Sequence, residues 1–150
     1  MNKLFFALLF LFVSVSFAQG YKEVWIKISG DETRQIYIDK NSIEPGDSND
    51  VKVWVMQMHI PPLNIESVNH KIYKSKTEYL FNTKLYRYAI LKIIYFDAKG
   101  RKLKSFDYSV KTRIPNYRYN YPIFDKSIEQ DILKTIYGYY PDLDPYRKNK

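Results

Sequence analysis

The chain has 150 residues, with 24 Lys and Arg against 16 Asp and Glu, and it contains no cysteine. The length fits a single domain whose core needs no covalent cross-link, and the lack of cysteine excludes disulfides, thiolate metal sites and a cysteine nucleophile. Aromatic residues make up 17% of the chain, and because aromatic side chains suit pleated surfaces the composition favours β-sheet.

The N-terminus has the form of an export signal. Lys3 precedes an uninterrupted apolar run over residues 4–13, and small residues then lead to Ala18. The run is shorter than the roughly 20 apolar residues that span a bilayer, so we expect cleavage between Ala18 and Gln19. No cysteine follows the run and no later segment is apolar enough to cross a membrane. We therefore expect an exported chain, periplasmic or secreted, with surface association open but without a lipid anchor or an integral span.

Strand patterns fill the first two thirds of the mature chain. Apolar and polar side chains alternate over residues 21–29, 34–39, 51–60, 76–82, 85–96 and 102–110. This period of two indicates β-strands. The segment 51–60 is apolar on both faces, which predicts an interior strand, and the prolines at 61 and 62 are expected to end it. We expect a loop over 63–75 and a hairpin turn over 97–100, where Gly100 can take a positive φ.

The pattern becomes helical after a Tyr-, Asn- and Pro-rich linker over 112–122. Ser127 and Gln130 form a capping-box pattern. The apolar positions that follow have helical spacing: Ile128, Ile132, Leu133, Ile136 and Tyr137. Gly138 is the expected stop, and the basic tail over 139–150 is expected to be flexible.

These elements predict an α+β fold. We expect an antiparallel β-sheet of about five to six strands with a C-terminal amphipathic α-helix packed on it. The expected domains are a signal peptide at 1–18, a β-rich domain at 19–138 and a flexible tail at 139–150. Apart from the cleavage site, the residues expected to serve the structure are Asp39, Ser42, Trp54, Gly100 and Ser127.

The sequence offers no arrangement of catalytic residues, so we expect neither an enzyme nor a bound cofactor or metal. Asp39 and Ser42 suit a turn in which short polar side chains bond to nearby backbone N–H groups. The two histidines, His59 and His70, have no metal-ligand spacing with a carboxylate pair. The acidic residues over 44–50 lack the number and spacing of ligands that calcium needs, so a solvated loop is expected there.

Basic and tyrosine side chains gather around the strands at 85–96 and 102–110. The candidate binding surface consists of Lys84, Arg87, Arg101, Lys102, Lys104 and Tyr108. Such a mixture can bind nucleic acid, but export argues against that partner. An acidic glycan, another protein or a second copy of the chain remain open. The alternative is that these cations only keep the sheet soluble and protect its edges from pairing.

Several segments, taken in order, resemble the surface-adhesin E family. They are Val24-Trp25-Ile26, Tyr37-Ile38-Asp39-Lys40-Asn41-Ser42-Ile43, Val51-Lys52-Val53-Trp54, Tyr95-Phe96-Asp97-Ala98-Lys99-Gly100 and the helix that begins after Ser127. The resemblance implies an antiparallel sheet with a C-terminal helix packed on it. It also implies a role at the bacterial surface, since the best-known member binds host matrix and serum proteins.

The chain departs from the family pattern in two ways. The family's two cysteines are replaced near Asn82 and Thr83 and near Ile136 and Tyr137, so apolar packing must hold the helix. The anchoring cysteine of the adhesin is also missing. Two functions therefore remain open: an exported, non-catalytic binding module, adhesin-like and directed at extracellular macromolecules, or a periplasmic structural or assembly module with no external ligand. The sequence does not identify the partner, the oligomeric state or the choice between surface and periplasm.

Overall fold

The computed structural model describes residues 21–113 and 118–147, so the predicted signal peptide and its cleavage site lie outside the described residues. The strands are β1 (Trp25–Gly30), β2 (Arg34–Asp39), β3 (Glu44–Pro45), β4 (Asp50–Ile65), β5 (Val68–Asn82), β6 (Arg87–Phe96), β7 (Lys102–Asp107) and β8 (Tyr121–Pro122). The helix α2 spans Ile128–Tyr139, and short 3-10 turns lie at Lys40–Ser42 (η1), Asp47–Asn49 (η2), Lys111–Arg113 (η3) and Pro141–Leu143 (η5).

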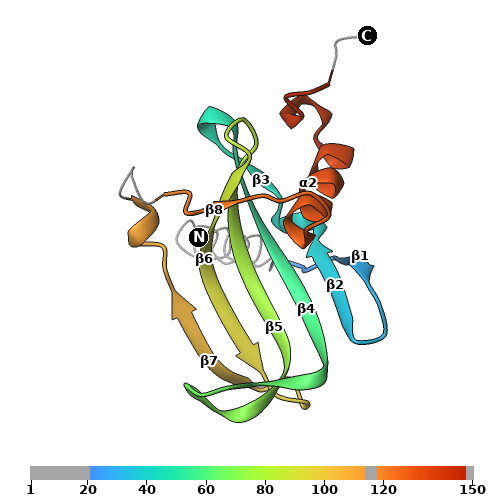
Figure 1. Ribbon diagram of the computed structural model, residues 1–150, viewed down its shortest axis with the longest axis vertical. Coiled ribbons are helices and arrows are strands. Elements are labelled where there is room, and N and C mark those ends of the chain that lie inside the picture. Colours follow the sequence, from blue (N-terminus) through green and yellow to red (C-terminus); the bar gives the residue numbers. More distant parts are fainter. Residues whose placement is uncertain (1–20, 114–117, 148–150) are drawn as a thin grey trace, which may run out of the picture.

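All strand pairs of the sheet are antiparallel. Six strands follow the order β1-β2-β4-β5-β6-β7, and the two-residue strands β3 and β8 pair with β4 and β6. The sheet is twisted, and α2 lies across one of its faces (Figure 1). This confirms the predicted α+β fold, in which a C-terminal helix packs on an antiparallel sheet.

The main core lies between the sheet and α2. Val51, Val53 and Val55 alternate along β4 toward the helix, and each is at most 4% exposed. From α2, Ile132 and Leu133 meet this row of valines. As in any sheet, residues two apart share a face, so the helical and strand periods predicted from the sequence together define the core.

Two sequence interpretations of the long hairpin are wrong. The strand β4 continues past the prolines to Ile65, and β5 begins at Val68, where a loop was expected. The prolines fall where the β4–β5 register shifts, between Met58 and Leu63, and such an irregular stretch does not need every ladder donor. The turn between the strands has no glycine to signal it.

The far ends of β4 and β5 extend beyond α2 and bend beneath β7 (Figure 1). The Lys104 Nζ donates to the backbone oxygen of Ser67 at this tip, over 2.7 Å. Ile72, on the extension, is completely buried. The extension therefore packs on the sheet and is a second structured region away from the helix.

Both the end of β7 and the end of α2 differ from prediction. The strand β7 stops at Asp107, because the Asp107 carboxylate accepts bonds from the N–H and hydroxyl of Ser109 and turns the chain. The helix passes Gly138 and ends at Tyr139. At its start, the Ser127 hydroxyl accepts from the Gln130 N–H, as predicted. The predicted flexible tail includes Pro141–Leu143, and Leu143 packs against the main core.

Candidate functional site

The Asp39–Ser42 corner is a structural joint. Asp39 is 1% exposed, and its carboxylate accepts from the backbone N–H groups of Val24 (2.8 Å) and Asn41 (3.1 Å) and from the Tyr21 hydroxyl. The Ser42 hydroxyl donates to the Asp39 carbonyl over 2.7 Å and accepts from the Trp54 N–H over 2.8 Å. These bonds join β1, η1 and β4, so these side chains are occupied by the fold.

Asp50 is the centre of a second polar network. Although it was expected in a solvated loop, it is 5% exposed. Its carboxylate accepts from the Asn82 amide (2.7 Å) and the Tyr119 hydroxyl, and it forms an ion pair with Arg118 (3.0 Å). Burial, and then the bond to Asp50, raises the pKa of Tyr119 to about 12. The carboxylate therefore fixes the segment after β7 to the start of β4.

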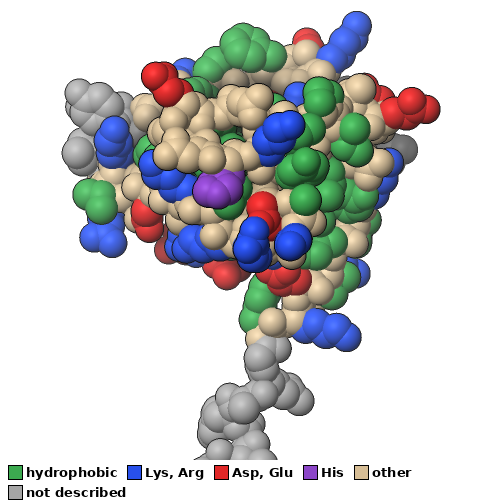
Figure 2. Space-filling model, turned by 90° about the horizontal axis from the view of Figure 1, so that it is seen from below, with side chains coloured by type: hydrophobic (Ala, Val, Ile, Leu, Met, Phe, Trp, Pro, Cys, Tyr) green, Lys and Arg blue, Asp and Glu red, His purple; other side chains and the backbone are tan. Residues whose placement is uncertain are grey.

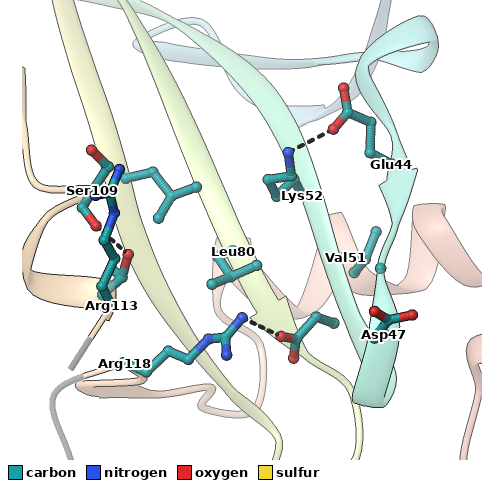
Figure 3. Close-up of a pocket in the computed structure, with 12 residues that line it drawn as sticks. Glu44, Asp47, Val51, Lys52, Leu80, Ser109, Arg113 and Arg118 are labelled. Atoms are coloured by element: carbon teal, nitrogen blue, oxygen red, sulfur yellow. Dashed lines mark hydrogen bonds and ion pairs between the residues drawn. The ribbon is translucent and has the colours of Figure 1, made fainter. Parts of the chain in front are cut away.

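A pocket of about 620 Å³ opens beside this network. Its lining residues are Glu44, Gly46, Asp47, Asp50, Val51, Lys52, Leu80, Leu91, Ser109, Thr112, Arg113 and Arg118. They come from two walls, the β3–η2–β4 region and the segment after β7, and from a floor on β5 and β6. Figure 3 shows the acidic side chains mostly on one wall, with Arg113 and Arg118 reaching in from the other. The volume falls in the range of small-molecule sites.

The floor of this pocket is apolar. Leu80 and Leu91 are each no more than 8% exposed and cluster with Ala89 and Tyr119. On the rim, Lys52 forms an ion pair with Glu44 over 2.7 Å, and the bond to Glu44 raises the pKa of Lys52. The pocket thus combines an apolar floor with charged groups on its walls, an arrangement that suits ligand binding.

Five of the six residues of the predicted basic surface fall into two groups. Lys84 and Arg87 lie at the start of β6, and Arg101, Lys102 and Lys104 lie near its end. Tyr108 lies between the two groups, where its N–H donates to the Leu91 carbonyl. The nine steps along β6 span about 30 Å. The Arg87 guanidinium donates hydrogen bonds to the backbone oxygens of Tyr119 and Asn120. The six residues therefore do not form one continuous surface.

The second group is also divided. Arg101 forms an ion pair with Asp97 over 2.7 Å, and Lys104 bonds to the β4–β5 tip. The ring of Tyr108 stacks with that of Phe106, with centroids 6.4 Å apart. Gly100 has the predicted positive φ, at 76°. Among the predicted cations near this turn, exposed Lys102 keeps its charged end available.

The sheet register adds a partner for Lys102 that the sequence did not suggest. Lys74 of β5 lies opposite Phe96 of β6, and Phe96 lies opposite Lys102 of β7. Lys74 and Phe96 share one face, and the Lys74 Nζ is 4.7 Å from the centre of the Phe96 ring. The β6–β7 register shifts between Tyr95 and Phe96, at the position of Lys102. We name Lys74, Phe96 and Lys102 the cation row. Only the strand pairing reveals it, since Lys74 was expected in a loop.

Neither histidine suggests catalysis. His59 is 6% exposed, and its Nε2 lies 3.0 Å from the Ser75 hydroxyl. His70 is exposed. Over residues 21–113 and 118–147, no cluster of three or more His, Cys, Asp or Glu side chains could hold a metal ion. In the same residues, no helix is long and apolar enough to cross a membrane.

The fold and the sites define the class of protein. It is a β-rich domain in which an antiparallel sheet carries a C-terminal helix, a pocket and the cation row. The family model of surface-adhesin protein E matches residues 25–136. The chain therefore belongs to the surface-adhesin E family, as its sequence segments suggested. No curated protein matches the chain, and no solved structure matches it.

Proposed function

We propose that this protein is an exported, non-catalytic binding module that attaches to acidic extracellular macromolecules through the cation row. Family membership supports an adhesin-like binding role. The observation that carries the choice of ligand is the arrangement of Lys74 and Lys102 on either side of Phe96. An acidic glycan is the partner that best suits two cations on the strands that flank one aromatic residue.

The charges around the row favour an anionic ligand. Two acidic side chains of this region already have partners, because Asp97 pairs with Arg101 and Glu23 pairs with Lys76. Among the described residues, neither Lys74 nor Lys102 belongs to an ion pair. Adjacent strands lie about 4.8 Å apart, so the two backbones are about 10 Å apart. This spacing allows both ammonium groups to reach one sulfated or carboxylated chain.

The lower end of the molecule carries side chains of both charges. Lys and Arg side chains are spread over this end, with acidic side chains among them, and hydrophobic side chains gather toward one side (Figure 2). Overall positive charge alone therefore gives no uniform basic surface here. Any polyanion site has to come from a local arrangement such as the cation row.

The test is retention on a heparin-like column. Lys74→Glu together with Lys102→Glu should lower the salt concentration needed for elution, because exposed charge attraction is screened over about 10 Å at 0.1 M salt. The matched control is Lys126→Glu together with Lys134→Glu, which changes the net charge equally at two exposed positions distant in sequence. The control variant should elute at nearly the same salt concentration as the wild type.

Two results would overturn this proposal. One is equal loss of retention in both double variants, which would show that only net charge matters. The other is unchanged retention after reversal of the cation row. The periplasmic alternative is tested separately by protease treatment of intact cells: degradation of the protein supports surface exposure, and complete protection supports a periplasmic module.

A further inference from the structure

The pocket beside Asp50 is separate from the cation row. Leu80 of its floor and Lys74 of the row are six residues apart on β5, which is about 20 Å. The pocket also differs in chemistry, since it has an apolar floor and both signs of charge on its walls. An inference about its ligand therefore does not rest on the proposed polyanion binding.

Most charged groups of the pocket neutralise one another. Lys52 pairs with Glu44, and Arg118 pairs with Asp50. The remaining charged residues that line the pocket are Asp47 and Arg113. In the described part of the chain, neither takes part in an ion pair. Both are exposed.

Asp47 and Arg113 stand on opposite walls. Asp47 belongs to η2 and Arg113 to η3, and in Figure 3 the two lie on opposite sides of the space above Leu80. A bound molecule that satisfies both must carry a positive group at one end and a negative group at the other. Its middle has to be apolar, because the floor between the walls is formed by buried leucines.

We propose that this pocket binds a small zwitterion with an apolar body, and that short apolar peptides with free ends are the class of ligand. The ammonium group lies toward Asp47. The carboxylate lies toward Arg113, whose planar guanidinium can hold two oxygens at once. The lining gives no net attraction for a polyanion, because its acidic side chains (Glu44, Asp47 and Asp50) are balanced by its basic ones (Lys52, Arg113 and Arg118). The volume of about 620 Å³ is within the range for drug-sized ligands.

The experiment is an isothermal titration calorimetry measurement, in which the dipeptide Leu-Leu is added to the purified mature protein. Leu-Leu amide lacks the carboxylate, and N-acetyl-Leu-Leu lacks the ammonium group. The test variants are Asp47→Asn and Arg113→Gln, which remove one charge each from exposed positions outside the core. The control variants, Glu66→Gln and Lys99→Gln, remove the same charges from exposed turns elsewhere.

Leu-Leu should bind the wild type, and each test variant should weaken binding about tenfold, the usual effect of losing one charge-assisted hydrogen bond. The modified ligands give a stricter test. Asp47→Asn should not weaken N-acetyl-Leu-Leu further, because that ligand has already lost the ammonium group. In the same way, Arg113→Gln should not weaken Leu-Leu amide further.

Absence of Leu-Leu binding to the wild type would overturn the proposal. So would equal weakening by the control variants, or equal binding of Leu-Leu and N-acetyl-Leu-Leu amide, which lacks both charged ends. The heparin column reports on the cation row alone. Failure of peptide binding therefore leaves the proposed polyanion binding standing, and failure of polyanion binding leaves this proposal standing.

Discussion

Asp50 brings together side chains that are far apart in the sequence. Asn82 and Tyr119 donate to its carboxylate, and Arg118 pairs with it. A buried carboxylate is tolerated only when such partners replace its water. The sequence placed Asp50 in a solvated loop, because its partners lie 32 or more residues away and no local pattern points to them.

His59 gives a prediction for the pH dependence of stability. Burial above all, and the nearby charge of Arg34, lower the pKa of His59 below its usual 6.5. The unfolded chain therefore binds a proton more readily than the folded chain. Stability from the neutral imidazole is fully present above about pH 6.5 and decreases as the pH falls below that value.

The test is urea unfolding of the wild type and of His59→Asn at pH 7.5 and pH 5. The wild type should lose more free energy of unfolding between these pH values than His59→Asn, because asparagine does not titrate. His70→Asn, at an exposed position, serves as the control and should keep the wild-type pH dependence. A His59→Asn protein with the same pH dependence as the wild type would contradict the prediction.

At the scale of elements, α2 is held to the sheet by apolar packing. Two of its side chains, Ile132 and Leu133, are at most 1% exposed. With no cysteine in the chain, no disulfide assists this contact. The helix cap contributes as well: the Ser127 hydroxyl accepts from the Gln130 N–H, and the Gln130 side-chain oxygen accepts from the Lys126 N–H. The cap determines the residue at which the helix begins, and the apolar face determines which side of the helix packs on the sheet.

Ile132→Asp should therefore unfold or severely destabilise the domain. Truncation of a buried isoleucine to alanine costs about 2–5 kcal/mol, and a buried carboxylate adds its own desolvation cost. Lys134→Asp, on the exposed face of the same helix, should cost no more than about 1 kcal/mol. Thermal melting followed by circular dichroism distinguishes the two. Similar melting temperatures for both variants would show that the helix is not packed on the sheet.

For the whole molecule, the expected export signal determines where the protein can meet a partner. We predict that the mature chain begins at Gln19, because the small residues Ser16 and Ala18 suit the signal peptidase. The mass of the intact protein recovered from the periplasm or the medium shows whether residues 1–18 have been removed. A mass that includes residues 1–18 would contradict both the cleavage and the export that we predict from it.

Local sequence patterns predicted most of the fold but little of the proposed binding sites. The alternation over 51–60 and the helical spacing from Ile128 predicted a central strand and a packed helix, and both are confirmed. The outer part of the long hairpin, over residues 61–75, was missed, because its turn residues Glu66 and Ser67 include no glycine, proline, asparagine or aspartate. Consequently Lys74 was assigned to a loop, although it lies in β5 opposite Phe96.

The sequence alone determined the class of fold, the helix cap, the Gly100 turn and the family. These depend on periodicity and on short-range backbone chemistry, which neighbouring residues carry. Only the tertiary structure decided that the predicted basic surface is split, that Lys74 joins Lys102 across Phe96, and that Asp47 faces Arg113 across an apolar floor. Such arrangements arise from strand register and from the path of the segment after β7. Long-range packing sets both, because a one-residue change in register turns every side chain of a strand to the opposite face.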